Sequence, residues 1–131
     1  MNKTILITAT TLGVLSVILG AFGAHGLKEL ISTQAQQTFE TGVRYQMYHA
    51  IVLLFVGNTS LLSLKTKKII LWLVIIGLVF FSGSLYGIAV NDLFTFNFKS
   101  IGFITPIGGF LLIISWVIML INFLKLNTDK S

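Results

Sequence analysis

Four long stretches of the chain carry no Asp, Glu, Lys or Arg, and no other feature of the sequence restricts the fold so strongly. They cover residues 4–27, 45–64, 69–91 and 100–124, and each is at least 20 residues long. About 20 helical residues cross a hydrocarbon core of roughly 30 Å. Because lipid offers backbone N–H and C=O groups no partner, such spans are helices or closed barrels. The alternating segments of about ten residues that a barrel requires are absent, so the pattern predicts membrane-spanning helices.

The predicted architecture is all-α, a four-transmembrane-helix antiparallel bundle that forms a single integral membrane domain over residues 1–131. Only 10% of the residues are charged, whereas a soluble domain carries about 25%. So few charges cannot cover a water-facing surface, but a lipid-facing surface needs none. The chain has no Cys, which excludes disulfides and thiolate metal ligands. The expected spans are about 4–25, 43–64, 69–91 and 101–125.

The connection between the first two spans, residues 26–42, has an amphipathic pattern. Apolar residues recur there at spacings of three and four, which predicts a short amphipathic interfacial helix between the first two spans, broken near Ser32. Thr33 and Gln36 fit a capping box that starts a helix running into the second span. An ordinary polar loop is the alternative. The apolar residues of the pattern are Leu27, Leu30, Ile31, Ala35 and Phe39.

The connection between the last two spans is rich in Phe around Lys99. Aromatic residues between polar ones predict a loop that lies against the lipid headgroups. Thr105 and Pro106 predict an N-cap followed by Pro at the first helical position. The alternative is a span that begins near Ser100 and is kinked at Pro106.

The basic residues predict the orientation. If all four spans cross, six lysines lie on one side of the membrane, and two lysines and one arginine lie on the other. An excess of Lys and Arg marks the cytoplasmic side, so we expect a cell-membrane protein with cytoplasmic N- and C-termini. The basic residues do not form the stripe that nucleic acid would need. The two sets are Lys3, Lys65, Lys67, Lys68, Lys125 and Lys130, against Lys28, Arg44 and Lys99.

Residues 1–24 also fit a secretory signal peptide. Lys3 precedes an apolar stretch, and the small residues Ala21 and Gly23 are spaced for cleavage before Ala24. The apolar stretch is longer than the core of a usual signal peptide, and its small residues suit a packed helix, which favours a first span. Under either interpretation, residues 26–42 lie outside the cell.

Distinctive polar residues of all four spans fall in the outer half of the predicted bundle. Polar groups inside a membrane are costly unless paired, so they form a candidate site. They fit hydrogen bonds between helices, which we favour, a proton relay or substrate pocket, or a metal site. A metal is disfavoured because no tight His-x-x-x-His or Glu-x-x-His motif occurs. The predicted cluster comprises His25, Arg44, Tyr45, Gln46, His49, Ser82, Ser84, Tyr86 and Thr105.

Three of these residues carry more specific expectations. His25 is expected to approach His49 if the first two spans pack as an antiparallel pair. Arg44 is expected to extend to the outer headgroups or to pair with Glu40 one turn before it. Glycines at helical spacings let backbones approach one another. The expected packing positions are Gly13, Gly20, Gly83, Gly87 and Gly109.

Four motifs occur along the chain in this order: Gly-Ala-Phe-Gly-Ala-His-Gly-Leu at 20–27, Arg-Tyr-Gln-Met-Tyr-His-Ala at 44–50, Phe-Ser-Gly-Ser-Leu-Tyr at 81–86 and Thr-Pro-Ile-Gly-Gly at 105–109. Together they resemble the transmembrane protein 256-like family, or domain of unknown function 423, over nearly the whole chain. The resemblance implies a multi-pass membrane protein, in bacteria one of the plasma membrane. It implies no activity, cofactor or catalytic residue. The link at 91–100 is longer and richer in Phe than is typical of that family.

We expect a non-enzymatic bundle that binds a partner protein or a lipid. No hydrolase, phosphate-binding or haem-attachment motif occurs, and neither a metal nor a cofactor is expected. The alternative is a small-solute, ion or proton transporter that uses the outer-half polar cluster within a homo-oligomer. An intramembrane enzyme with His25 or His49 as acid or base is the weakest hypothesis, because no nucleophile is coupled to either residue.

Overall fold

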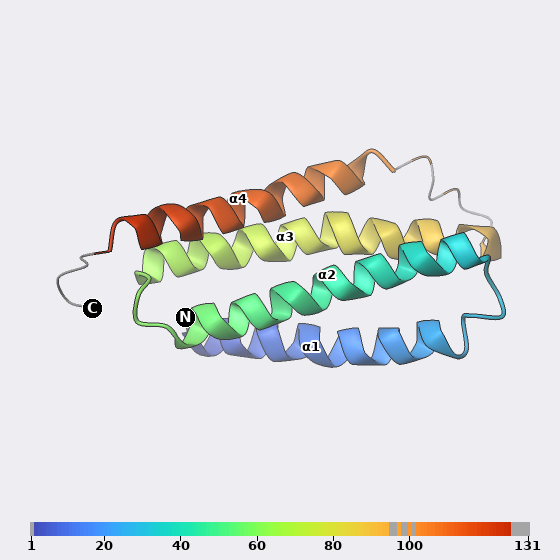
Figure 1. Cartoon of the computed structure of the whole chain (residues 1–131), viewed down its shortest axis with the longest axis horizontal. Helices are drawn as coiled ribbons and strands as arrows, with labels where there is room; N and C mark the ends of the chain where they lie inside the picture. The colour runs from blue at the N-terminus through green and yellow to red at the C-terminus, as the bar shows by residue number, and fades with distance from the viewer. Residues whose placement is uncertain (1, 95–96, 98–99, 101, 127–131) are drawn as a thin grey trace.

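The computed structural model describes residues 2–94, 97, 100 and 102–126, and its elements are helical (Figure 1). The prediction of an all-α fold is confirmed. A short 3-10 helix, η1 (Asn91–Leu93), follows the third of four α-helices. The four are α1 (Asn2–Ala24), α2 (Thr33–Asn58), α3 (Leu64–Ala89) and α4 (Ile104–Leu124).

Successive helices run antiparallel. α1 and α3 begin at one end of the bundle, and α2 and α4 finish there (Figure 1). At this end Lys67 is buried, and its Nζ donates to Asn2 Oδ1 at 3.0 Å, which ties the start of α3 to the start of α1. We call it the basic end, because it carries Lys3, Lys65, Lys67, Lys68 and Lys125, while Lys130 lies outside the described residues.

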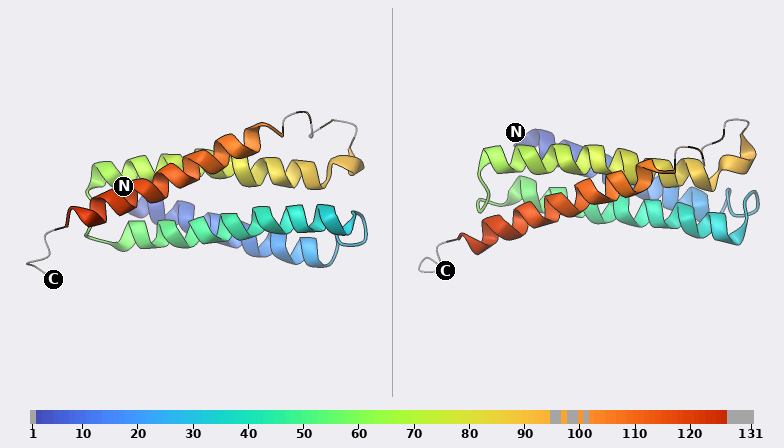
Figure 2. Two further views of the ribbon diagram at one scale, coloured as in Figure 1. Left: turned by 45° about the horizontal axis from the view of Figure 1, so that its top comes forward. Right: turned by 90° about the horizontal axis from the view of Figure 1, so that it is seen from above.

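Each helix packs on the next one along the chain, so α2 and α3 form the centre and α1 and α4 flank them (Figure 2). The shared core is apolar. Ile5, Leu53 and Ile70, from α1, α2 and α3, have no exposed surface, and α4 adds Leu112 and Met119. Because the flanking helices do not close the bundle, open grooves remain between α1 and α3 and between α2 and α4.

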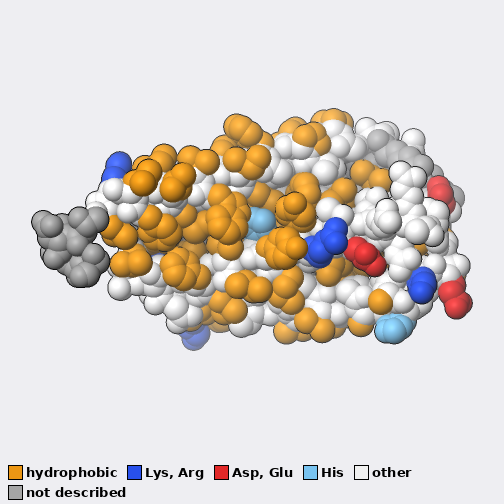
Figure 3. Space-filling model, viewed as in Figure 1, with side chains coloured by type: hydrophobic (Ala, Val, Ile, Leu, Met, Phe, Trp, Pro, Cys, Tyr) orange, Lys and Arg blue, Asp and Glu red, His pale blue; other side chains and the backbone are white. Residues whose placement is uncertain are grey.

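The face of the bundle seen in Figure 3 is apolar along most of its length. Side chains such as Val17, Val79 and Ile113 are 60–63% exposed, and a soluble protein does not present a continuous surface of this kind to water. Among the described residues, α1, α3 and α4 are long and apolar enough to cross a membrane. α2 falls short because polar residues occupy its first half.

Residues 25–32, all of which the structure describes, contain no separate helix. Residues 25–30 form turns, and the Ser32 hydroxyl caps α2 by accepting from Ala35 N at 3.0 Å. The predicted amphipathic interfacial helix is therefore wrong, and so is a helix start capped by Thr33. Ser32 is extended (φ −67°, ψ 162°) and satisfies an N–H of the first turn. Residues 33–42, whose periodicity suggested the separate helix, are the first turns of α2.

α4 begins at Ile104, one residue before its predicted cap. The Thr105 hydroxyl bonds Ser84 on α3 instead of capping its own helix, so Thr105 as the N-cap is wrong, as is a helix start near Ser100. Pro106 is tolerated in the first turn because N–H groups there have no acceptor within the helix. Parts of the Phe-rich connection lie outside the described residues, namely Thr95, Phe96, Phe98, Lys99 and Ile101.

Candidate functional site

Gln46 on α2 joins three helices through one side chain that is 6% exposed. Its Nε2 donates to the backbone carbonyl of Leu12 on α1 at 3.0 Å. The Tyr86 hydroxyl on α3 donates to Gln46 Oε1 at 2.6 Å. We call these three residues the Gln46 network. Sequence reasoning had no means of finding Leu12, because any residue can offer a backbone carbonyl.

Gly42 and Ser82 fix the position of Tyr86. The Ser82 hydroxyl on α3 is buried and donates to the Gly42 carbonyl on α2 at 2.7 Å. A Cβ at Gly42 would stand 2.7 Å from the Tyr86 ring, so only glycine leaves room for that ring. Phe39, one turn earlier on α2, also packs against this ring, with ring centroids 5.1 Å apart. α2 and α3 therefore hold the Tyr86 hydroxyl against Gln46.

His49 on α2 is buried, and both of its ring nitrogens have partners. Nδ1 lies 2.7 Å from the Tyr45 carbonyl, and Trp116 Nε1 on α4 lies 3.1 Å from Nε2. The carbonyl can only accept and the indole N–H can only donate. The ring is therefore the neutral tautomer with its proton on Nδ1. Trp116 was missed, although an indole N–H inside an apolar span needs an acceptor.

Ser84 on α3 and Thr105 on α4 form a further link between helices. The Ser84 hydroxyl donates to its own helix, at Phe81 O over 2.9 Å. Because a hydroxyl has one proton, Thr105 is the donor to Ser84. This pair lies where α4 begins and joins that end of α4 to α3.

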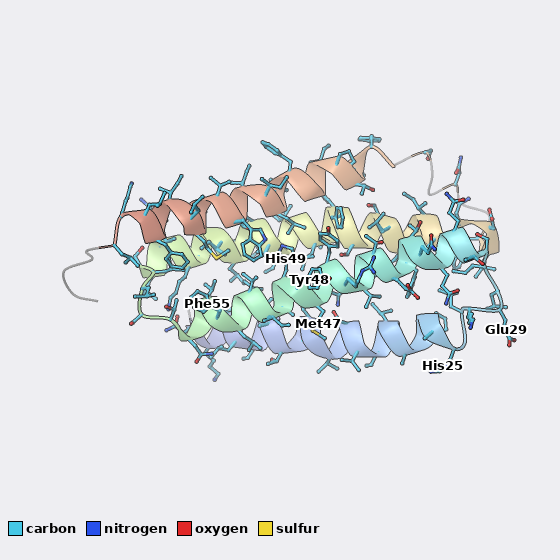
Figure 4. All side chains as sticks on the ribbon, viewed as in Figure 1. His25, Glu29, Met47, Tyr48, His49 and Phe55 are labelled. Atoms are coloured by element: carbon cyan, nitrogen blue, oxygen red, sulfur yellow. The ribbon has the colours of Figure 1, made fainter. Side chains whose placement is uncertain are left out.

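Other members of the predicted cluster stay apart. His25 is exposed in the turn after α1, far along the bundle from His49 (Figure 4), so the expected approach of the two histidines is wrong. Arg44 is exposed, and its Nη2 donates to Thr41 Oγ1 at 3.2 Å. Tyr45 is partly exposed and packs against Phe81, with the two rings tilted and their centroids 4.9 Å apart. Among the described residues, no three His, Asp or Glu side chains gather as metal ligands.

The Gln46 network forms part of the wall of the groove between α1 and α3, which we call the α1–α3 groove. Its volume is about 520 Å³, and its lining is mostly apolar. Ser82 and Gly83 lie beside Tyr86 in the same wall. No charged side chain of the described residues lines it. The lining residues are Ile7, Thr8, Thr11, Leu12, Leu15, Leu19, Gln46, Ile75, Leu78, Val79, Ser82, Gly83 and Tyr86.

The predicted packing glycines differ in what they meet. A Cβ at Gly20 or Gly109 would make ordinary contact with Val43 or Phe81, at 3.5 Å in each case. At Gly13 and Gly83 nothing described lies within 4 Å, so these two do not pack helices within the chain. Gly87 is half-buried on α3. The tightest positions are Gly23, Gly42, Gly57, Gly77 and Gly108.

Comparison with known proteins gives a consistent match. Residues 19–109 match the family model described as "Protein of unknown function (DUF423)". A "UPF0382 membrane protein" of Staphylococcus epidermidis is 39% identical over 123 residues, which cover 94% of this chain and 97% of the relative. The Bacillus subtilis "UPF0382 membrane protein YwdK" is 38% identical over 94% of this chain and 98% of its own.

More distant relatives keep the same extent. The "UPF0382 inner membrane protein YgdD" of Escherichia coli is 31% identical over 96% of this chain and 93% of its own. No solved structure matches the chain. The aligned regions therefore extend over the described helices and their connections. All three residues of the Gln46 network lie within them.

Proposed function

The chain belongs to the DUF423 family of membrane proteins, and we propose that it binds the acyl chain of a membrane lipid in the α1–α3 groove. The observation that carries this proposal is the groove itself. It is open to the side of the bundle, apolar over most of its lining, and bounded by the amide of Gln46 and the phenol of Tyr86. A ligand that is mostly hydrocarbon with one polar group suits these walls.

The proposal includes four membrane crossings. α1 and α3 are candidate spans and begin at the same end of the bundle. The chain must therefore return across the membrane between them, and α2 is the segment that connects them. Its 26 residues exceed the roughly 20 that a crossing needs. Its polar first turns then lie at the headgroups.

We place the protein in the cell membrane with the basic end in the cytoplasm, so both termini are cytoplasmic. The excess of lysine at that end supports this orientation. The described acidic residues Glu29, Glu40 and Asp92 belong to the other half of the molecule. The name of the Escherichia coli relative includes "inner membrane", which supports the cell membrane as the location here.

The length of the groove fits one leaflet. Its lining runs from Ile7 to Leu19 on α1 and from Ile75 to Tyr86 on α3. About twelve residues at 1.5 Å rise correspond to roughly 18 Å, close to half of a hydrocarbon core of roughly 30 Å. Gln46 and Tyr86 lie toward the end away from the lysines. A single acyl chain of the outer leaflet has this length and this polarity.

The hydrogen bonds of the polar residues support binding rather than transport or catalysis. Gln46, Ser82 and Ser84 each form a hydrogen bond to a neighbouring helix, so they hold the helices together. His49 has a partner at each nitrogen, which leaves it no free base for catalysis. We therefore expect a non-enzymatic protein.

Photocrosslinking tests the proposal. The purified protein is placed in bilayers that contain phosphatidylglycerol with a photoreactive diazirine in one acyl chain, and adducts are mapped by mass spectrometry. We expect adducts to concentrate in the groove, at residues such as Leu15 and Val79. An even distribution that includes exposed positions of α4 such as Ile113 would refute a groove site.

Two glycine variants provide a matched control. Gly83 lines the groove and has nothing within 4 Å of its Cβ position, so Gly83→Trp should place its ring in the groove without a clash at Cβ. Gly13 is equally free but faces a different groove, between α1 and α2. We expect Gly83→Trp to lose most of the adducts in the α1–α3 groove and Gly13→Trp to keep them.

A further inference from the structure

Ser16 on α1 is 1% exposed, and its hydroxyl has no hydrogen-bond partner in the described part of the chain. A helical serine usually donates to the carbonyl four residues earlier, which here belongs to Leu12. That oxygen has two lone pairs. It already accepts a helical N–H and the amide of Gln46. Two side-chain donors therefore compete for one acceptor, and Ser16 is left without a partner.

The register of α1 and α2 places these competitors opposite each other. Gly57 lies against Ile5 and Leu6, Gly20 against Val43, and Gly23 against Phe39. On this antiparallel register, Ser16 faces Gln46. A buried donor without a partner destabilises a protein, and each such group calls for an explanation. Ser16 stands where it can replace Gln46 at the Leu12 carbonyl.

We propose that Gln46 recognises the ester carbonyl of the bound acyl chain and that Ser16 takes over the Leu12 carbonyl when it does. This inference rests on the proposed function of the α1–α3 groove. In the empty state, Gln46 Nε2 donates to Leu12 and Ser16 donates to nothing. In the bound state, Ser16 rotates to donate to Leu12, and Nε2 turns to the ligand. Binding thus satisfies a donor that the empty protein leaves unpaired.

The chemistry of the groove limits the group that Gln46 can bind. Its Oε1 already accepts from Tyr86, so the free function is the Nε2 donor, and the ligand must supply an acceptor. In the part of the chain that the structure describes, no Lys or Arg lines the groove, which disfavours a phosphate or carboxylate. A neutral carbonyl at the head of a hydrocarbon chain meets both conditions. Glycerolipids carry such a carbonyl in each acyl ester.

Ester and ether lipids separate this inference from groove binding itself. Two phosphatidylglycerols with identical chains, one a diester and one a diether, compete for the purified protein, and bound lipid is counted by native mass spectrometry. We expect the protein to retain the diester in about three- to tenfold excess, the effect of one net hydrogen bond. Gln46→Leu should abolish the preference, and Ser16→Ala should reduce it by making release of Leu12 unfavourable.

Ser115→Ala is the matched control. Ser115 is also a buried helical serine, but it belongs to α4 and its hydroxyl donates to Leu112 O at 2.6 Å. The Ser115→Ala variant should therefore keep the preference for the diester. Equal retention of both lipids by the protein would overturn the role of Gln46 while the groove site stands. A preference that survives Ser16→Ala unchanged would overturn the role of Ser16. If the protein retains neither lipid and Gly83→Trp removes no crosslinks, the groove site itself is overturned.

Discussion

The indole N–H of Trp116 on α4 donates to Nε2 of His49 on α2 across 3.1 Å. The rings meet edge to face with centroids 6.0 Å apart. The other ring nitrogen, Nδ1, donates to the Tyr45 carbonyl at 2.7 Å. Elsewhere α2 and α4 border an apolar groove, in which Phe55 and Phe123 meet edge to face with centroids 6.2 Å apart. The His49–Trp116 pair therefore adds a hydrogen bond to the apolar contacts between α2 and α4.

Removing the indole donor should loosen that link. Trp116→Phe keeps most of the ring but leaves His49 Nε2 without its donor. We expect the free energy of unfolding to fall by about 0.5–1.5 kcal/mol, a usual value for one hydrogen bond between membrane helices. Unfolding by a denaturing detergent measures it. Trp72→Phe, at a half-exposed indole on α3, is the control and should change little; equal losses from both would show that the bond contributes nothing.

The Gln46 network should show compensation between its partners. Gln46→Leu leaves the Tyr86 hydroxyl without an acceptor, so we expect a loss of about 1–3 kcal/mol in the free energy of unfolding. Adding Tyr86→Phe removes the stranded hydroxyl, and the double variant should recover much of that loss. Gln37→Leu, at an exposed site on the same helix, serves as the control. Losses that simply add would contradict the coupling of Gln46 and Tyr86.

Two glycines should respond to alanine with opposite signs. At Gly108 a Cβ would overlap the backbone of Phe81 and Gly77 on α3, so Gly108→Ala should push α4 away and cost about 1–3 kcal/mol. At Gly83 the space is empty, and Gly83→Ala should stabilise α3 by up to about 1 kcal/mol through its helix propensity. The same unfolding assay compares them. A common sign would mean that the α3–α4 crossing is not as close as the structure has it.

The fold was largely predictable because lipid leaves few choices to an uncharged stretch of 20 residues. The first and last residues of the helices were less predictable. The loss of charge marks where hydrocarbon begins, whereas a helix continues until its backbone is capped. α2 therefore starts at Thr33, ten residues before the expected span, because the Ser32 hydroxyl caps it. It finishes at Asn58 because the next residue, Thr59, is extended (φ −80°, ψ 146°) and leaves the helix.

The candidate site was predictable in its residue types but not in its pairings. Gln46, His49 and Ser82 were expected to bond between helices, and they do. Their partners depend on register. The contact of Gly23 with Phe39 sets His25 level with the start of α2 rather than with His49. Backbone partners such as the Leu12 carbonyl cannot be predicted from residue type, because every residue has a carbonyl.

The natural absence of Cys permits a direct test of the four crossings, since a single introduced thiol is the only one in the chain. Glu29 lies in the exposed turn between α1 and α2, and Ser60 is exposed between α2 and α3. A membrane-impermeant maleimide should label Glu29→Cys in intact cells and Ser60→Cys only after permeabilisation, because we propose that the lysine-rich end lies in the cytoplasm. The reverse pattern would mean that the protein has the opposite orientation and that the groove lies in the inner leaflet. Labelling of both thiols from one side would mean that α2 does not cross, and then α1 and α3 could not both span the membrane in the same direction.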